Sequence, residues 1–82
     1  MGKLHEQMKA DLTLKGYSAN TFAGYLPRCR KFAAHFNRSP EEMGREEIRA
    51  FLLYLAEEEQ VSAGLQKAYL SAIKFLYRYT LN

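Results

Sequence analysis

Hydrophobic residues recur every three or four positions along most of the chain, the spacing that places them on one face of an α-helix. Four such stretches occur, at about residues 3–15, 19–36, 45–58 and 63–79, and a short helical turn is predicted near residues 40–43. No stretch alternates hydrophobic and polar residues with the period of two that is typical of a β-strand. The pattern predicts an all-α fold, a compact bundle of four helices joined by short loops.

Residues that favour helix ends stand at the borders of these stretches. Ser18 and Ser62 are predicted N-caps, because a serine hydroxyl can accept a hydrogen bond from a free amide of the first helical turn. Gly16 follows the first stretch and suits the left-handed conformation that often ends a helix. Pro27 lies inside the second stretch and removes a backbone hydrogen bond there. Because the hydrophobic positions keep their phase across Pro27, we expect one kinked helix instead of two.

The last stretch combines a hydrophobic face with a basic one. The residues expected to be buried are Leu65, Tyr69, Ala72, Ile73 and Leu76. The polar residues on the opposite side, at steps of three and four, are Lys67, Ser71, Lys74 and Arg78. A helix of this kind packs its first face into the core and can offer its second face to a partner.

Charge is unevenly distributed, although the net charge of the 82 residues is only +3. Residues 17–38 contain four basic residues and no acidic one, and residues 60–82 contain three basic residues and no acidic one. Residues 39–59 contain seven glutamates and two arginines. Two basic segments without acids are typical of a surface that faces phosphate groups, and we expect the acidic segment to lie away from it. The alternative is that these cations only keep the surface solvated.

The sequence argues against several other classes of protein. Cys29 is the only cysteine, so neither an intramolecular disulfide nor a cysteine zinc cluster can form. No phosphate-binding loop or nucleophile motif occurs, and the two histidines, His5 and His35, stand on different predicted helices. No hydrophobic run approaches the length of a membrane span, and the N-terminus is unlike a secretory signal. We therefore expect a cytoplasmic chain that is not itself an enzyme and has no cofactor, metal or membrane partner.

Three groups of residues, taken together, resemble a known family. The first group is Gly16-Tyr17-Ser18 with Thr21, Tyr25 and Phe32; the second is Ile48-Arg49-Ala50-Phe51-Leu52 with Tyr54-Leu55; the third is Val61-Ser62-Ala63 with Gln66, Leu70-Ser71-Ala72 and Phe75-Leu76-Tyr77-Arg78. In this order and at these separations they are similar to the N-terminal core-binding (SAM-like) domain of the tyrosine recombinases, the phage and integron integrases. The resemblance covers about residues 4–81.

The resemblance implies a SAM-like four-helix bundle in which residues 1–82 form a single DNA-binding domain. In that family the second and fourth helices lie toward the major groove of duplex DNA, as one half of a clamp that holds the DNA for strand exchange. A separate catalytic domain supplies the tyrosine nucleophile, so we expect this chain to be a fragment without that domain. The expected partners are double-stranded DNA, the catalytic domain of the same parent chain and other recombinase protomers.

Nine polar or basic residues are the candidate DNA contacts. They are Ser18, Asn20, Thr21, Arg28, Lys31, Lys67, Ser71, Lys74 and Arg78. The first three surround a predicted helix N-terminus, whose free amides favour a phosphate group, and the alternative for Ser18 is a role as a cap alone. The five cations would neutralise phosphates or reach base edges, where an arginine–guanine pair is the most specific contact. Tyr69, Phe75 and Tyr77 are expected in the core or at its edge.

A small helical protein–protein interaction module is the alternative from a different class. It would bind its partner through an apolar edge formed by Leu53, Tyr54 and Leu70, and salt would affect that binding little. DNA binding should instead weaken steeply as salt is added. A helix-turn-helix regulator fits less well, because residues 37–47 are too long and too acidic for the tight turn of that motif.

Overall fold

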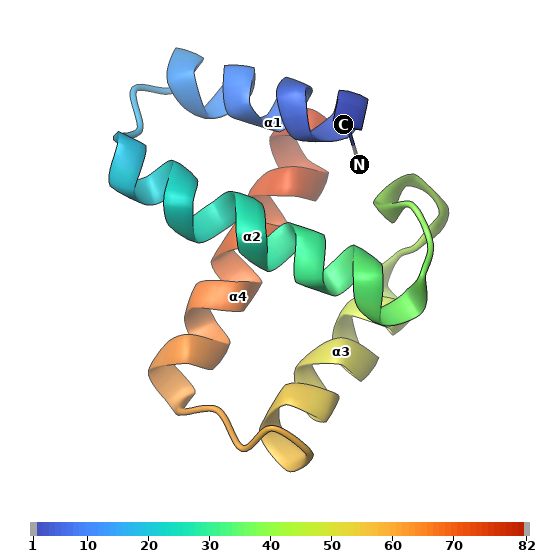
Figure 1. The fold of residues 1–82 in the computed structure, drawn as a ribbon. Coiled ribbons are helices and arrows are strands. Elements are labelled where there is room, and N and C mark those ends of the chain that lie inside the picture. The colour runs from blue at the N-terminus through green and yellow to red at the C-terminus, as the bar shows by residue number, and fades with distance from the viewer. Residues whose placement is uncertain (1, 82) are drawn as a thin grey trace.

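The computed structural model describes residues 2–81, which fold into helices without a β-strand (Figure 1). The α-helices are α1 (Gly2–Leu14), α2 (Ala19–Phe36), α3 (Arg45–Glu57) and α4 (Ala63–Phe75). A 3₁₀ turn, η1, spans Pro40–Glu42, and a π-helical segment, η2, spans Leu76–Thr80 and continues α4. The predicted all-α four-helix bundle is confirmed, and the bounds of α2 are those that the sequence predicts.

Helices α2 and α4 cross at the centre of the bundle (Figure 1). Helix α1 packs against α2 and against η2, at the C-terminal end of α4. Helix α3 packs against α4 and against α2, and the loop after α3 leads into the start of α4. Helix α2 contacts α1, α3 and α4, whereas α4 contacts α3 and its continuation η2 contacts α1. The crossing of α2 and α4 therefore determines how the surface shared by these two helices is arranged.

Buried hydrophobic side chains form two clusters, and α2 and α4 contribute to both. The cluster beneath α1 contains Leu4, Met8, Leu12, Leu26, Cys29, Ala72, Phe75 and Leu76. The cluster beneath α3 contains Phe32, Met43, Phe51, Leu55, Tyr69 and Ile73. The hydrophobic stripe of α2 is therefore buried as its periodicity predicts. Tyr69 and Phe75 are buried and Tyr77 is half-buried, as expected of core or core-edge residues.

Cys29 joins the two central helices inside the first cluster. Its Sγ–H donates a hydrogen bond to the backbone oxygen of Ala72 at 3.3 Å, and its side chain is fully buried. Burial raises the pKa of the Cys29 thiol to about 12, because an apolar surrounding disfavours the charged thiolate. The thiol is therefore a neutral packing group of the core.

The residues that favour helix ends in the sequence stand at the observed ends of α1 and α4. The Ser62 hydroxyl accepts a hydrogen bond from the Leu65 N–H at 3.2 Å and caps α4. At the end of α1, Gly16 has a φ of +81°, and the N–H of Tyr17 bonds the oxygen of Leu12 at 3.0 Å. The N–H of Gly16 bonds the oxygen of Thr13, which completes a Schellman motif. The predicted roles of Ser62 and Gly16 are confirmed.

Substituting Gly16 with alanine is expected to lower the melting temperature by about 4–16 °C. An added Cβ would meet no atom within 4 Å, so the effect comes from the backbone alone. A left-handed conformation costs a residue with a Cβ about 1–2 kcal/mol, and 1 kcal/mol shifts Tm by about 4–8 °C in a domain of this size. Thermal unfolding followed by circular dichroism measures the shift. The control is Gly64→Ala, within helix α4, which should raise Tm; a Gly16→Ala variant as stable as the wild type would contradict the prediction.

Two features differ from the sequence-based expectation for residues 63–79. Regular α-helix ends at Phe75, and the N–H of Leu81 bonds the oxygen of Leu76 at 2.9 Å, five residues back. Hydrophobic spacing does not distinguish this wider π turn from an α turn, which is why the sequence did not reveal it. Leu65, expected in the core, is 36% exposed. It lies in the first turn of α4, before Tyr69 and Ala72, which contact residues of α2.

Helix α2 runs without a break through Pro27, so the expectation of one helix is confirmed. Helix α3 begins after Gly44, whose N–H donates a hydrogen bond to Glu47 Oε1 at 2.8 Å. This bond is the main reason why the pKa of Glu47 is lowered.

None of the helices in residues 2–81 combines the length and hydrophobicity that crossing a bilayer requires.

Candidate nucleic-acid interface

The N-terminus of α2 carries three of the candidate residues. The Ser18 Oγ accepts a hydrogen bond from the Thr21 N–H at 3.4 Å, which confirms Ser18 as the N-cap. The Ser18 and Thr21 hydroxyl oxygens also lie 3.3 Å apart and share a hydrogen bond. Asn20 is exposed beside them. Two hydroxyls and an amide side chain therefore surround a helix end whose dipole favours an anion.

The basic face of α4 is exposed, and part of it meets the start of α2. Lys67, Ser71, Lys74 and Arg78 are all exposed. The last three line a shallow hollow of about 180 Å³ together with the aromatic rings of Tyr17, Tyr25, Phe75 and Tyr79. Because Tyr17 precedes the Ser18 cap, this hollow links the α4 cations to the N-terminus of α2. Lys67 and Asn20 lie on the same two helices but outside the hollow.

Aromatic rings form the apolar floor and rim of this hollow. The ring of Tyr17 lies 5.9 Å from that of Tyr25 and 5.5 Å from that of Phe75, centroid to centroid. Tyr79 lies 5.0 Å from Phe75, and the Lys15 ammonium stands 4.1 Å from the centre of the Tyr79 ring. Tyr17, Tyr79 and Lys15 are absent from the predicted site. The signals that could have pointed to the two tyrosines are their places next to Ser18 and to Arg78.

Two cations of α2 converge on one aromatic ring of α4. The Arg28 Cζ lies 5.8 Å from the centre of the Tyr69 ring, and the Lys31 Nζ lies 5.9 Å from it. Tyr69 is only 9% exposed, so both cations stand at the junction of the crossing helices. Arg28 and Lys31 are thus brought next to α4, while their attraction to the ring is modest in energy.

Lys31 also has an acidic partner. Its Nζ lies 2.6 Å from Glu59 Oε1, and the Tyr54 hydroxyl donates a hydrogen bond to Glu59 Oε2 at 3.0 Å. The bond to Glu59 raises the pKa of Lys31, and the bonds from Lys31 and Tyr54 lower the pKa of Glu59. The expectation that the acidic segment 39–59 lies away from the basic surface is therefore wrong at its last residue. The reason is that α3 packs against α2, which brings Glu59, just after the end of α3, within reach of Lys31.

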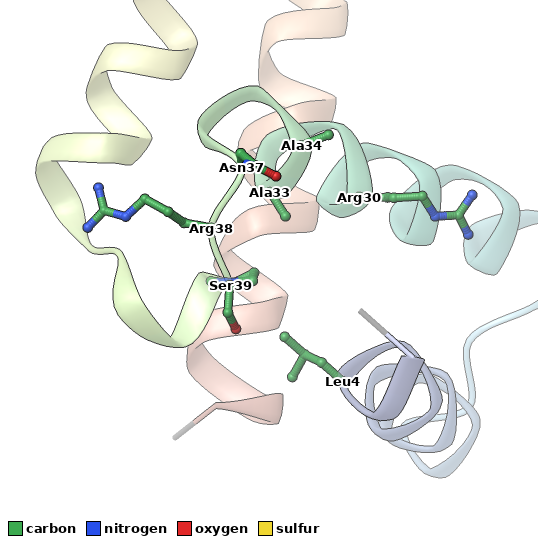
Figure 2. A pocket seen from close by; sticks show the side chains of 8 residues that line it. Leu4, Arg30, Ala33, Ala34, Asn37, Arg38 and Ser39 are labelled. Atoms are coloured by element: carbon green, nitrogen blue, oxygen red, sulfur yellow. The ribbon is translucent and has the colours of Figure 1, made fainter.

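The other two cations of segment 17–38, Arg30 of α2 and Arg38 of the loop after it, lie on another side of the bundle. Arg30 and Arg38 line a hollow of about 360 Å³ that also contacts Leu4 of α1. Figure 2 shows their side chains pointing away from each other. Arg38 donates a hydrogen bond to the backbone oxygen of Glu42 at 3.2 Å and lies 4.0 Å from a Glu47 carboxylate oxygen. These two arginines do not converge on a common point, so the four basic residues of segment 17–38 divide between two surfaces.

Comparison with known proteins gives a family and several relatives. The family model described as "Phage integrase, N-terminal SAM-like domain" matches residues 4–82. A Sinorhizobium fredii protein described as "Putative integrase/recombinase y4qK" is 33% identical over 81 residues, which is 99% of this chain and 26% of that protein. Proteins described as "Integrase/recombinase" from Escherichia coli and from Pseudomonas aeruginosa are each 33% identical over 76 residues, 92% of this chain and 23% of theirs.

The chain thus spans about a quarter of the length of the curated relatives that it matches. No solved structure shows a significant match.

Proposed function

This chain belongs to the family of N-terminal SAM-like domains of phage integrases, and from this membership we propose that it is the DNA-binding domain of a site-specific tyrosine recombinase. In this proposal residues 1–82 act as one domain, and α2 and α4 hold duplex DNA in its major groove as one half of a clamp. Strand exchange would be carried out by a catalytic domain elsewhere in the parent chain. That domain and other recombinase protomers would be the protein partners.

The observation that carries the proposal is that cations of α2 and α4 lie at two places where these helices meet, the Tyr69 ring and the aromatic hollow. Arg28 and Lys31 of α2 approach the Tyr69 ring of α4, while Lys74 and Arg78 line the hollow that reaches the start of α2. A surface on which two helices offer cations side by side fits the closely spaced phosphates of a duplex. The family relationship says which ligand to expect, and the arrangement of the cations supports it.

The candidate residues would make different kinds of contact with DNA. Lys67, Lys74 and Arg78 are exposed lysine and arginine side chains that would neutralise phosphates along one strand. Ser71, between them, would donate a hydroxyl hydrogen bond. The Ser18, Asn20 and Thr21 group would receive a further phosphate at the N-terminus of α2. Lys31 would exchange its Glu59 partner for a phosphate when DNA arrives, so DNA has to compete with that carboxylate.

Binding of a fluorescent random-sequence duplex of about 30 base pairs tests the proposal. Three to five phosphate contacts predict an affinity that falls about 40- to 500-fold between 50 and 200 mM salt, because each contact contributes about −0.9 to the slope of log K against log salt. Micromolar binding at the lower salt is expected, which is usual for non-specific complexes. Fluorescence anisotropy measures both quantities.

The absence of duplex binding at low salt would overturn the proposal for the isolated chain. An affinity that does not change with salt would favour the other class of function, a protein–protein interaction module. The apolar edge expected for that function is partly available, because Leu53 is 54% exposed. Replacing Leu53 with a charged residue should leave DNA binding unchanged if the proposal is correct, and should remove binding of a protein partner if the alternative is.

A further inference from the structure

Gly24 lies one helical turn before Arg28 on α2, and the arginine side chain folds back over it. A Cβ at position 24 would lie 2.6 Å from Arg28 Nη1 and 3.6 Å from Arg28 Cζ. A separation of 2.6 Å is too short for two non-bonded heavy atoms of this kind. The guanidinium therefore occupies space that exists only because residue 24 has no side chain.

Tyr69 faces the same guanidinium from α4. Its ring centre lies 5.8 Å from Arg28 Cζ, and the ring is held in the core cluster beneath α3. Arg28 is half-buried, whereas Lys31, Lys74 and Arg78 are exposed. The arginine is thus seated between the bare backbone of one crossing helix and an aromatic ring of the other, whereas Lys31 is paired with Glu59, and Lys74 and Arg78 are exposed on α4.

The seated guanidinium keeps its hydrogen-bonding capacity. The ion pairs in residues 2–81 involve Lys31 with Glu59 and Arg38 with Glu47, and Arg28 takes part in neither. Its planar fork of N–H donors is the group that pairs bidentately with the O6 and N7 atoms of guanine in the major groove. A donor that is already oriented loses less conformational freedom on binding than a flexible side chain does.

We propose that Gly24 and Tyr69 are positioning residues that hold the Arg28 guanidinium ready to read a base edge, so that Arg28 is the sequence-reading cation of α2. This inference rests on the proposed function, and it adds which cation reads sequence and how that cation is oriented. The other cations then contribute mainly salt-dependent phosphate contacts. Gly24 contributes nothing to the charge of the surface, and its effect is exerted only through Arg28.

The Gly24→Ala variant separates this role from charge and from stability. Alanine favours helix interiors over glycine, and the flexible end of Arg28 can move aside, so Tm should rise by several degrees. The guanidinium is displaced in the process while the net charge stays the same. Sequence discrimination should therefore fall in a variant that is more stable than the wild type, a combination that damage to the fold cannot produce.

The experiment uses duplexes that the wild-type chain selects from a randomised 30-base-pair pool. The measured quantity is the ratio of affinity for the selected duplex to affinity for the unselected pool. Arg28→Ala should reduce this ratio about 5- to 150-fold, the range expected for one bidentate pair. Gly24→Ala should reduce it several-fold, should leave pool affinity and its salt slope unchanged, and should have no further effect when combined with Arg28→Ala.

Gly64→Ala is the matched control. A Cβ at that helical glycine would meet only the Ser62 Oγ, at an ordinary 3.9 Å, so Tm should rise and the affinity ratio should not change. The inference is overturned if Gly24→Ala leaves the ratio unchanged, if it lowers the ratio equally in the Arg28→Ala background, or if the wild type binds the pool without enriching any sequence. Failure of the proposed function would look different, because the wild type would then not bind the pool at all.

Discussion

Replacing Phe32 with alanine is expected to destabilise the bundle by about 3–5 kcal/mol, the usual cost of truncating a fully buried phenylalanine. Its ring is completely buried and lies 5.4 Å from the ring of Phe51 and 5.8 Å from that of Phe36. These edge-to-face contacts, together with a Tyr77 contact at 6.4 Å, are lost with the ring. Total stability for 82 residues is about 4–12 kcal/mol, so this one change removes a large share of it.

Urea unfolding followed by circular dichroism measures this loss. The matched control is Phe22→Ala, because Phe22 is only partly buried at the edge of the other cluster. We expect the Phe22 variant to unfold at a clearly higher urea concentration than the Phe32 variant. Equal midpoints for the two variants would show that Phe32 is not a central contact between α2 and α3.

Reversing two charges on the α4 face, with Lys74→Glu and Arg78→Glu together, is expected to weaken binding to a random-sequence duplex strongly. Each reversal removes a proposed phosphate contact and adds a repulsive carboxylate. The salt slope should become shallower by about 1.8, and affinity at 50 mM salt should fall on the order of 100-fold. Both side chains are exposed, so the helical circular dichroism signal should be retained.

A second double reversal, Lys3→Glu with Lys9→Glu on α1, controls for net charge. Either pair of changes lowers the net charge from +3 by four units, to −1. Lys3 and Lys9 are also exposed, but they lie on a helix outside the proposed interface. The α1 variant should lose only the long-range part of the attraction. Equal loss in both variants would mean that net charge, and not the α4 face, determines binding.

The parts of the fold that could be predicted are those fixed by local residues. Ser18 and Ser62 cap their helices through bonds to amides three residues away, and Gly16 adopts its left-handed conformation two residues beyond the end of α1. The hydrophobic positions keep their phase across Pro27, and this was enough to predict that α2 continues through the proline. These residues lie within a few positions of the structure that they determine, so their effect can be predicted without knowledge of the tertiary structure.

The missed features depend on where distant segments meet. Lys31 and Glu59 are 28 residues apart, and the packing of α3 against α2 brings them together. Leu65 has the spacing of a core residue, but it lies in the first turn of α4, before Tyr69 and Ala72, which contact α2. The π turn after Phe75 differs from an α turn in its hydrogen bonds and not in the residue types that it contains.

The candidate site was likewise predictable in kind but not in arrangement. The sequence identifies the acid-free basic segments, and the structure divides their cations into groups. Arg28 and Lys31 lie at the Tyr69 ring, Lys74 and Arg78 lie at the aromatic hollow, and Arg30 points elsewhere. Gly24 and Arg28 lie only one helical turn apart in the sequence. The role that we propose for their contact depends also on the Tyr69 ring, which the fold places opposite the guanidinium.

The burial of Cys29 makes the folded chain unreactive toward thiol reagents. Its sulfur is enclosed between α2 and α4, and its raised pKa leaves almost no thiolate at neutral pH. A maleimide can therefore reach it only when the two helices separate, so the alkylation rate reports how often the pair opens. A cysteine introduced at an exposed position, such as that of Lys67, would accept a fluorescent or spin label selectively while the native thiol stays in place.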